Sequence, residues 1–306
     1  MSRKRRPQAL TAESRTLARL ALSLFEDEQQ RNAFTNALLN PQELAVAVVW
    51  LGNRPEPMPF PVLARPAWAP DWIDFVSIEH RPGRHALHES GAYYCLDPSS
   101  VFESQVLTAA AIEGCETMID VCASPGGKTI LASRILNPRA MVCNEVIRKR
   151  TAALSSNLKR CRIANASVTN CKVEQLATDY AEAADVVIVD APCSGQSLIA
   201  RGKESPGCFH PATINLNSNR QRRILAHSAS IVRRGGFLAY MTCTFARKEN
   251  ERNLDWFLKN HPDWSAQPVP ILEQHRSPFS ETPCYRIWPQ GGVGAGGFTA
   301  IVQRHF

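Results

Sequence analysis

Two cysteines in this sequence follow short apolar runs and could act as nucleophiles. Cys193 stands shortly after the run 186–189, with Asp190 between them, and Cys243 follows the run 237–241. A thiolate can add to an electron-poor carbon, and the covalent intermediate divides one difficult step into two easier ones. A single cysteine after a strand is more often a packing residue. Two cysteines in matching positions, one with a carboxylate beside it, favour chemistry.

A loop earlier in the chain has the composition of a nucleoside-binding turn. Residues 119–129 are predicted to form a strand, a tight turn of small residues and the start of a helix. In α/β proteins such a turn lets a ligand approach the backbone at a helix N-terminus, and Gly126 and Gly127 leave room for it. A phosphate-binding P-loop would need a glycine where this chain has Cys122, so that alternative fails at a required residue.

An acidic residue completes the nucleoside-binding interpretation. Glu145 stands at the end of the next predicted strand, where a carboxylate can accept hydrogen bonds from both hydroxyls of an adenosine ribose. The alternative for Glu145 is a solvated carboxylate at a strand end. Together with the preceding loop, Glu145 predicts a cofactor that carries a nucleoside.

Alternating strands and helices must position these residues. Runs rich in valine and isoleucine predict strands at 118–121, 140–143, 167–169, 186–189 and 237–241, with a last edge strand at 298–302. Helices are predicted at 128–136, 147–160, 217–233 and 246–260. Such alternation is typical of an α/β fold with a parallel sheet covered on both faces. Both cysteines would then lie just past the carboxyl ends of strands, where open α/β sheets bind their ligands.

The first part of the chain differs from this pattern. Residues 1 to about 50 are predicted to be helical, since apolar residues between 17 and 25 share one helix face. Six prolines between residues 54 and 70 indicate a linker or an extended segment, and residues 71–98 have no firm assignment. We therefore predict a small, mainly helical N-terminal domain over residues 1–95 and a second domain over residues 96–306.

Composition restricts the class of protein. The 306 residues carry a formal net charge of +7, which permits a polyanionic partner without requiring one. The ten cysteines include no Cys-x-x-Cys pair, so we expect no metal site. The first apolar stretch is interrupted by Arg19, and no apolar run is long enough to span a bilayer. We expect a cytoplasmic protein without a membrane partner, whose thiols are free.

Three motifs taken together resemble those of a known family. Residues 122–128, the Asp-Ala-Pro-Cys-Ser-Gly motif at 190–195 and the Thr-Cys-Thr segment with the Glu-Asn pair that follows it (242–250) resemble the Sun/NOL-type family of RNA 5-methylcytosine methyltransferases, also called the RsmB/NOP family. The resemblance covers about residues 91–306. It implies a Rossmann-like class I methyltransferase fold, S-adenosylmethionine as cofactor and RNA as substrate.

The resemblance also implies a role for each site residue. Cys243 attacks carbon 6 of cytosine, Asp190 hydrogen-bonds the ring, and Cys193 assists loss of the carbon-5 proton or release of the product. Lys128 reaches the cofactor or the base, although its alternative is a solvent-facing lysine. Because the attacking group is a thiolate, the pKa of Cys243 should be lowered. The residues expected to bind the cofactor are Cys122, Ala123, Ser124, Pro125, Gly126, Gly127, Lys128, Glu145, Lys172 and Asp190.

Departures from the family pattern leave two alternatives open. Lys172 stands where the family usually has an acid that contacts adenine, Leu96 replaces a common glutamine, and residues 296–299 lack the usual aspartate and second phenylalanine. These changes permit a catalytically inactive RNA-binding or assembly factor of the same fold. The other alternative exchanges the thiols, with Cys193 attacking as the corresponding thiol does in DNA cytosine methyltransferases.

Basic residues indicate where RNA would bind. With an RNA substrate, some of them should contact phosphates without reading sequence, and residues 1–95 would form an RNA-binding region beside the methyltransferase domain. We expect ribosomal RNA in preference to transfer RNA, and a monomeric enzyme. The basic groups are Arg3 to Arg6, then Arg148, Lys149, Arg150, Lys159, Arg160 and Arg162, then Arg220, Arg222, Arg223, Arg233 and Arg234.

Overall fold

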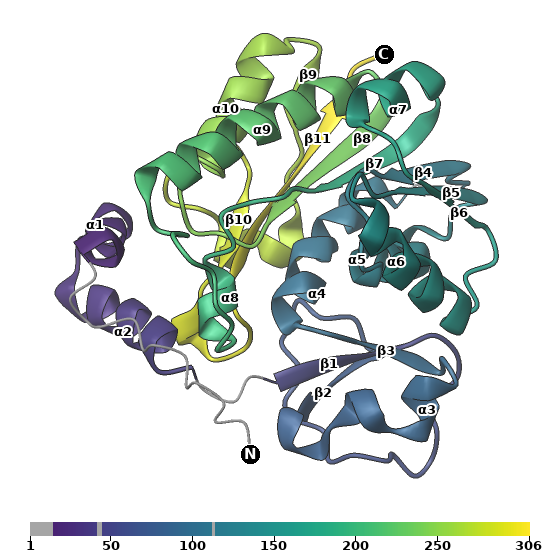
Figure 1. The fold of residues 1–306 in the computed structure, drawn as a ribbon, viewed down its shortest axis with the longest axis horizontal. Coiled ribbons are helices and arrows are strands. Elements are labelled where there is room, and N and C mark those ends of the chain that lie inside the picture. Colours follow the sequence, from purple (N-terminus) through teal and green to yellow (C-terminus); the bar gives the residue numbers. More distant parts are fainter. Residues whose placement is uncertain (1–14, 42–44, 112–113) are drawn as a thin grey trace.

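The computed structural model describes residues 15–41, 45–111 and 114–306, and its centre is one large mixed sheet (Figure 1). The eight-stranded sheet has the order β10-β11-β8-β7-β4-β5-β6, and β9 also pairs with β11. The pairs from β8 to β6 are parallel, whereas every pair that includes β11 is antiparallel. The strands are β4 (Thr117–Asp120), β5 (Ala140–Asn144), β6 (Ala166–Thr169), β7 (Ala184–Asp190), β8 (Val232–Thr242), β9 (Trp264–Ala266), β10 (Tyr285–Ile287) and β11 (Gly297–Arg304).

Helices cover both faces of this sheet because alternate strand residues point to opposite sides. Val186 and Ile188 of β7 belong to one core, whereas Val187 and Val189 belong to the other. The first core contains α4 (Pro98–Ser104), α5 (Gly127–Leu136) and α6 (Arg148–Arg160), and the second contains α7 (Val173–Asp179), α9 (Pro211–Ala229) and α10 (Glu251–Asn260). The predicted α/β fold class is confirmed. Among the described residues, no helix is long and apolar enough to cross a membrane.

Three sequence predictions about these elements need correction. The helix predicted at 217–233 is α9, which begins at Pro211 and ends at Ala229, because the chain already enters β8 at Val232. The segment 298–302 is a strand, but β11 lies between β8 and β10 and is not at the edge. Residues 45–50 were predicted to be helical and instead form a strand, since Ala-Val-Ala-Val-Val-Trp is rich in β-branched residues.

The N-terminal region contains two helices and a small sheet. The helices are α1 (Arg15–Leu24) and α2 (Glu28–Leu39), and the basic segment Arg3 to Arg6 lies outside the described residues. β1 (Ala45–Trp50) is the middle strand of an antiparallel sheet between β2 (Ile73–Ser77) and β3 (Tyr93–Leu96). The segment 71–98, which had no assignment from sequence, thus supplies two of the three strands. Short helices complete the chain: η1 (Ile78–His80), η2 (Pro82–Arg84), α3 (Ala86–Glu89), η3 (Gln105–Ala110), α8 (Ser197–Ala200), η4 (Pro270–His275) and η5 (Pro289–Gly291).

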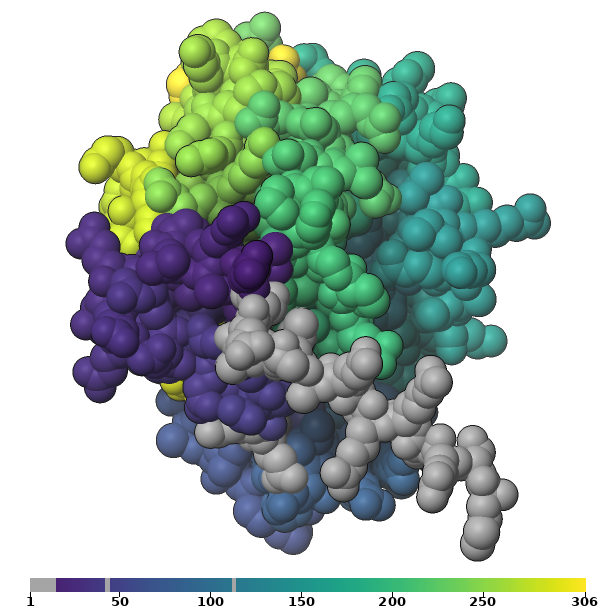
Figure 2. Space-filling view, turned by 60° about the vertical axis from the view of Figure 1, so that its left-hand side comes forward, coloured from purple at the N-terminus to yellow at the C-terminus, as the bar shows by residue number. Residues whose placement is uncertain are grey.

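The helices α1 and α2 pack on the C-terminal part of the chain. Figure 2 shows them in purple against the yellow C-terminal segment and the green region beside it. The Phe34 ring meets Phe245 edge-on at a centroid distance of 5.0 Å, and Phe25 lies 4.9 Å from Trp288. Phe245 follows Cys243 by two residues. The N-terminal helices therefore cover the back of a loop that carries a candidate catalytic thiol.

We expect Phe34→Ala to reduce the free energy of unfolding by about 3–5 kcal/mol, because it removes a fully buried aromatic side chain and leaves a cavity. Urea denaturation followed by circular dichroism measures this change. Leu22→Ala is the matched control, since Leu22 lies on the same pair of helices but is 62% exposed, and it should change stability by less than about 0.5 kcal/mol. Equal effects of the two substitutions would contradict the packing described here.

Candidate active site

The loop between β4 and α5 brings bare backbone to the carboxyl end of the sheet. Gly126 adopts a φ of 108°, a conformation that side chains with a Cβ rarely adopt. The start of the loop is fixed by Asp120, which accepts hydrogen bonds from the Cys122 N–H (3.2 Å) and the Thr129 hydroxyl (2.6 Å). At Gly127, a Cβ atom would come within 2.5 Å of the Leu96 side chain. The sequence therefore needs both glycines for this turn.

Arg150 connects the loop to the carboxylate that follows β5. Its guanidinium donates to the Ser124 carbonyl oxygen (2.6 Å) and lies 3.0 Å from Glu145 Oε2. The other oxygen of Glu145 accepts a hydrogen bond from the Ile147 N–H at 2.8 Å. Glu145 is almost completely buried, so the alternative of a solvated carboxylate is wrong. Arg150 was predicted only as part of a basic cluster on a helix.

A cavity of about 760 Å³ opens at this edge of the sheet. Its wall combines the loop after β4, the ends of β5 and β7, the start of α7 and one face of α9. Side chains of both charges and several apolar groups share it. The lining includes Cys122, Ser124, Asn144, Glu145, Val146, Ile147, Arg150, Lys172, Val173, Glu174, Asp190, Pro192, Cys193, Arg220, Arg223, Ile224 and Cys243.

Both candidate thiols line this cavity and contact each other. The Sγ atoms of Cys193 and Cys243 are 3.0 Å apart. The hydrogen bond from Cys193 lowers the pKa of the Cys243 thiol; Lys128 acts in the same direction, while burial and Asp190 oppose it. The same hydrogen bond, together with burial, raises the pKa of Cys193. The pair therefore consists of one thiol with a lowered pKa and one with a raised pKa, in agreement with the predicted lowering for Cys243.

A buried carboxylate fixes the two loops that carry these thiols. Glu249 accepts hydrogen bonds from the Ser194 N–H (2.9 Å) and the Ser194 hydroxyl (2.6 Å), so it holds the residue after Cys193. Its neighbour Asn250 accepts from the Thr242 hydroxyl (2.6 Å), which holds the residue before Cys243. The Glu-Asn pair thus sets the relative positions of the two sulfur atoms.

Lys128 is buried beneath Asp190 and does not face solvent, so that alternative is wrong. Its Nζ atom lies 2.5 Å from Asp190 Oδ1 and 2.6 Å from Glu103 Oε2. Burial lowers the pKa of Lys128, but the two carboxylates outweigh burial and raise it overall, so the side chain stays an ammonium group. Sequence reasoning missed Glu103, because nothing in its local pattern distinguishes it from other helical glutamates.

The structure brings most of the predicted site residues together. Asp190, Cys193 and Cys243 line one cavity with Cys122, Ser124, Glu145 and Lys172. The other residues of the predicted set do not line it: Ala123, Pro125, Gly126, Gly127 and Lys128 shape or support the wall. Within the described residues, no group of three or more histidine, cysteine, aspartate or glutamate side chains could hold a metal ion.

The family described as 16S rRNA methyltransferase RsmB/F matches residues 107–303, which is more than half of the chain. The chain belongs to this family. The predicted resemblance is therefore confirmed, and membership identifies S-adenosylmethionine as the cofactor.

Curated relatives within the RsmB/F family are longer than this chain. The ribosomal RNA small subunit methyltransferase F of Serratia proteamaculans is 27% identical over 237 residues, a match that covers 76% of this chain and 49% of the relative. The enzyme of the same name from Klebsiella pneumoniae is 32% identical over 204 residues, covering 66% and 42%. The chain thus spans about half the length of the curated relatives it matches.

Solved structures share the fold of this family member. A methyltransferase homolog protein from Pyrococcus horikoshii superposes with a TM-score of 0.74 at 20% identity, covering 94% of this chain and 97% of the homolog. NSun6 from the same organism, solved with SFG, gives a TM-score of 0.71 at 17% identity and covers 95% and 98%. At these identities the likeness establishes the Rossmann-like methyltransferase fold.

We expect iodoacetamide to modify Cys243 faster than Cys193 near pH 7, because a thiol whose pKa is lowered is thiolate at any pH above that value. Cys193→Ala removes the donated hydrogen bond, so the midpoint of the Cys243 reaction should move to higher pH. Mass spectrometry of the two peptides over a pH series measures both rates. Equal reactivity of the two thiols, or a midpoint unmoved by Cys193→Ala, would refute this description of the pair.

Proposed function

We propose that this protein methylates carbon 5 of cytosine in RNA, through a covalent adduct between Cys243 and carbon 6 of the base. The observation that carries the proposal is the pair of sulfur atoms 3.0 Å apart, of which one thiol has a lowered pKa, at the wall of a cavity suited to a nucleoside. A cavity for the cofactor alone would not need two thiols beside a carboxylate.

The residues that line the cavity suit S-adenosylmethionine. Glu145 presents a buried carboxylate for the ribose hydroxyls, and the apolar side chains of Ile147, Val173 and Ile224 offer a surface for the adenine. Lys172 cannot accept a hydrogen bond from the adenine amino group as an acid would, so either a backbone group makes that contact or the cofactor binds more weakly. When bound, S-adenosylmethionine supplies an electrophilic methyl group.

The residues on the substrate side account for each step of the chemistry. Carbon 5 of cytosine is a weak nucleophile until the Cys243 thiolate adds to carbon 6, which breaks the aromaticity and places electron density on carbon 5. Asp190, with Lys128 behind it, lies where it can hydrogen-bond the ring as charge develops. After methylation, a water molecule takes the proton from carbon 5, the electrons of that carbon–hydrogen bond restore the double bond to carbon 6, and the electron pair of the carbon–sulfur bond returns to Cys243.

Cys193 is suited to the release step. Its thiol keeps its proton and lies within hydrogen-bonding distance of Cys243 Sγ, so it can stabilise the thiolate as that group leaves carbon 6. This arrangement opposes the alternative in which Cys193 attacks, because a thiol with a raised pKa is the poorer nucleophile at neutral pH.

Ribosomal RNA is the substrate class that we propose, with transfer RNA as the alternative. The curated relatives act on ribosomal RNA according to their names. The base must leave its stack to expose carbon 6, and Arg220 and Arg223 on α9 line the cavity, where they can contact flanking phosphates. Lys172 permits the alternative of an inactive RNA-binding factor. That alternative does not explain why both thiols are present at the cavity.

Cys193→Ala should accumulate a covalent protein–RNA adduct, because release is blocked after attack, whereas Cys243→Ala should form none. Incubation with ribosomal RNA and labelled S-adenosylmethionine, followed by denaturing electrophoresis, separates the adduct from free protein. Cys95→Ala is the control, since Cys95 lies in the small N-terminal sheet. An adduct with Cys243→Ala and none with Cys193→Ala would mean that the two thiols have exchanged roles.

Glu145→Gln should weaken binding of S-adenosylmethionine about tenfold or more, because hydrogen bonds to a charged acceptor contribute about 1.5–3 kcal/mol. Isothermal titration calorimetry with S-adenosylhomocysteine measures the dissociation constant without turnover. Glu116→Gln is a matched control on the surface, where Glu116 pairs with Arg139 at 3.3 Å. Unchanged affinity in Glu145→Gln would show that the cofactor does not use this carboxylate.

A further inference from the structure

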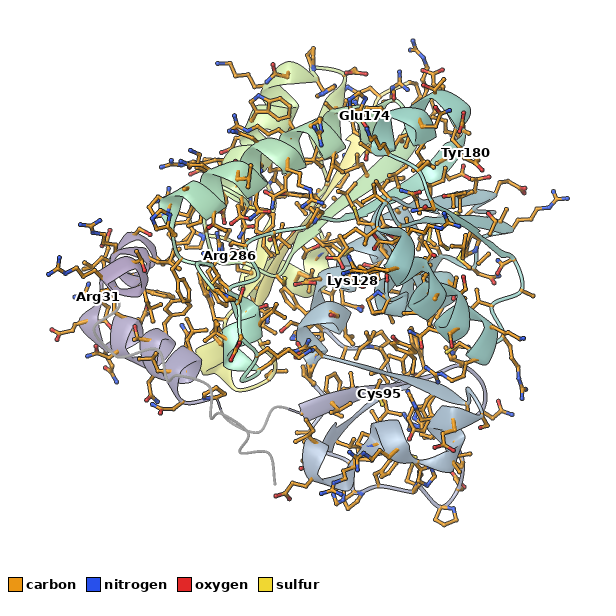
Figure 3. The ribbon with its side chains drawn as sticks, viewed as in Figure 1. Arg31, Cys95, Lys128, Glu174, Tyr180 and Arg286 are labelled. Carbon is orange, nitrogen blue, oxygen red and sulfur yellow. The ribbon has the colours of Figure 1, made fainter. Side chains whose placement is uncertain are left out.

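Glu103 on α4 is a buried carboxyl group that the chemistry above does not use. It is 1% exposed, and its Oε2 atom lies 2.6 Å from Lys128 Nζ, which on its other side lies 2.5 Å from Asp190 Oδ1. Asp190 lines the cavity, whereas Glu103 and Lys128 do not. The three groups therefore form a row that leads from the interior of the protein to the substrate side of the cavity. Figure 3 shows Lys128 near the centre of the molecule, close to α4.

The neighbouring strand β11 provides the space for this carboxyl group. A Cβ atom at Gly297 would lie 1.7 Å from Glu103 Oε1, so only glycine at that position leaves room. Two residues on, the Thr299 hydroxyl donates a hydrogen bond of 2.8 Å to the Glu103 carbonyl oxygen and fixes the backbone of α4 there. Gly297 therefore leaves room for the Glu103 side chain, and Thr299 holds the backbone that carries it.

Glu103 changes its charge in the pH range where thiols ionise. Burial raises its pKa to about 8, against the attraction of Lys128 and with the repulsion of Asp190 and Cys243. These three groups, from α5, the end of β7 and the loop after β8, are the charged and titratable groups that act on it. Since electrostatic interaction is mutual, an ionised Glu103 opposes the thiolate of Cys243.

We propose that Glu103 is a positioning residue for cytosine methylation: it holds the Lys128 ammonium group and controls how much of that positive charge acts on Asp190 and Cys243. The proposal rests on the proposed function for its role in catalysis, but its effect on the Cys243 thiol does not require RNA. When Glu103 is protonated, the full positive charge of Lys128 acts on Asp190 and stabilises the Cys243 thiolate. When Glu103 is ionised, it neutralises part of that charge and adds repulsion.

The first test measures the pH midpoint at which iodoacetamide modifies Cys243, in the absence of RNA and cofactor. Glu103→Gln keeps the size and the oxygen that faces Lys128 but cannot ionise, so the midpoint should fall by up to about one pH unit, or about tenfold in thiolate at a fixed pH. Glu116→Gln should leave the midpoint unchanged. An unmoved midpoint in Glu103→Gln, with a wild-type circular dichroism spectrum, would overturn the proposal.

Two further variants test whether the shift is specific to the carboxyl group and whether it depends on Lys128. Glu103→Met removes the carboxyl group with little change in volume and should shift the midpoint in the same direction. In a Lys128→Met background, Glu103 has no ammonium partner and stays protonated, so Glu103→Gln should then have no effect. Additive shifts in this double-mutant cycle would contradict action through Lys128.

Steady-state kinetics separate this proposal from the proposed function. Glu103→Gln should change kcat and its pH profile while the KM values for RNA and S-adenosylmethionine stay the same, because Glu103 does not reach the cavity. A purely structural role would lower the melting temperature and leave the pH profile unmoved, which overturns the proposal. If the wild-type protein makes no 5-methylcytosine although the Cys243 midpoint responds to Glu103→Gln, the proposed function fails and the control of the thiol by Glu103 stands.

Discussion

The contact between the sulfur atoms of Cys193 and Cys243 constrains most of the active site. The contact forms only if the loops that follow the adjacent strands β7 and β8 place their cysteines at the same level along the sheet. Asp190 pairs with Met241 in the parallel register of β7 and β8, and the Ala191 N–H continues the ladder by donating to the Met241 carbonyl oxygen at 2.9 Å. A shift of one residue in this register would turn the side chains to the opposite face of the sheet and separate the thiols. The sheet register therefore sets the geometry of the candidate active site.

Burial of charge around the thiols makes the site sensitive to its supporting residues. Glu249 has a raised pKa because burial outweighs its hydrogen bonds, yet those bonds join the loop after β7 to the loop after β8. A buried ion pair, Arg286 with Glu251, also supports the Cys243 loop, because Arg286 donates to the Phe245 carbonyl oxygen at 3.1 Å. Removing either partner of such a pair leaves an uncompensated charge, which costs about 3–5 kcal/mol. The buried polar groups around the Cys243 loop therefore favour a single conformation of that loop.

Sequence patterns predicted the central sheet and placed both cysteines after strands of that sheet, for physical reasons. The run 186–189 is apolar at every position because β7 is covered on both faces, and Cys193 follows it at the carboxyl end, where ligands bind. Patterns did not reveal Glu103 or Arg150, because their partners stand far away in the sequence: Lys128 in one case and the Ser124 carbonyl in the other. The antiparallel strands β1 to β3 were also missed, since their pairing spans a proline-rich segment with no periodicity.

The position of β11 explains why the C-terminal departures from the family pattern are compatible with an active site. As an interior strand, β11 pairs with β8 over six residues, and Phe298 lies opposite Thr242, the residue before Cys243. A substitution in β11 can therefore affect the position of the Cys243 thiol in two ways. It can shift the backbone of β8, and it can shift the side chains that pack on β11. Gly297 has no side chain and leaves room for the Glu103 carboxyl group, which lies within ion-pair distance of Lys128. The interior strand β11 thus leaves room for the Glu103–Lys128 pair behind Asp190 and pairs with the strand that leads to Cys243.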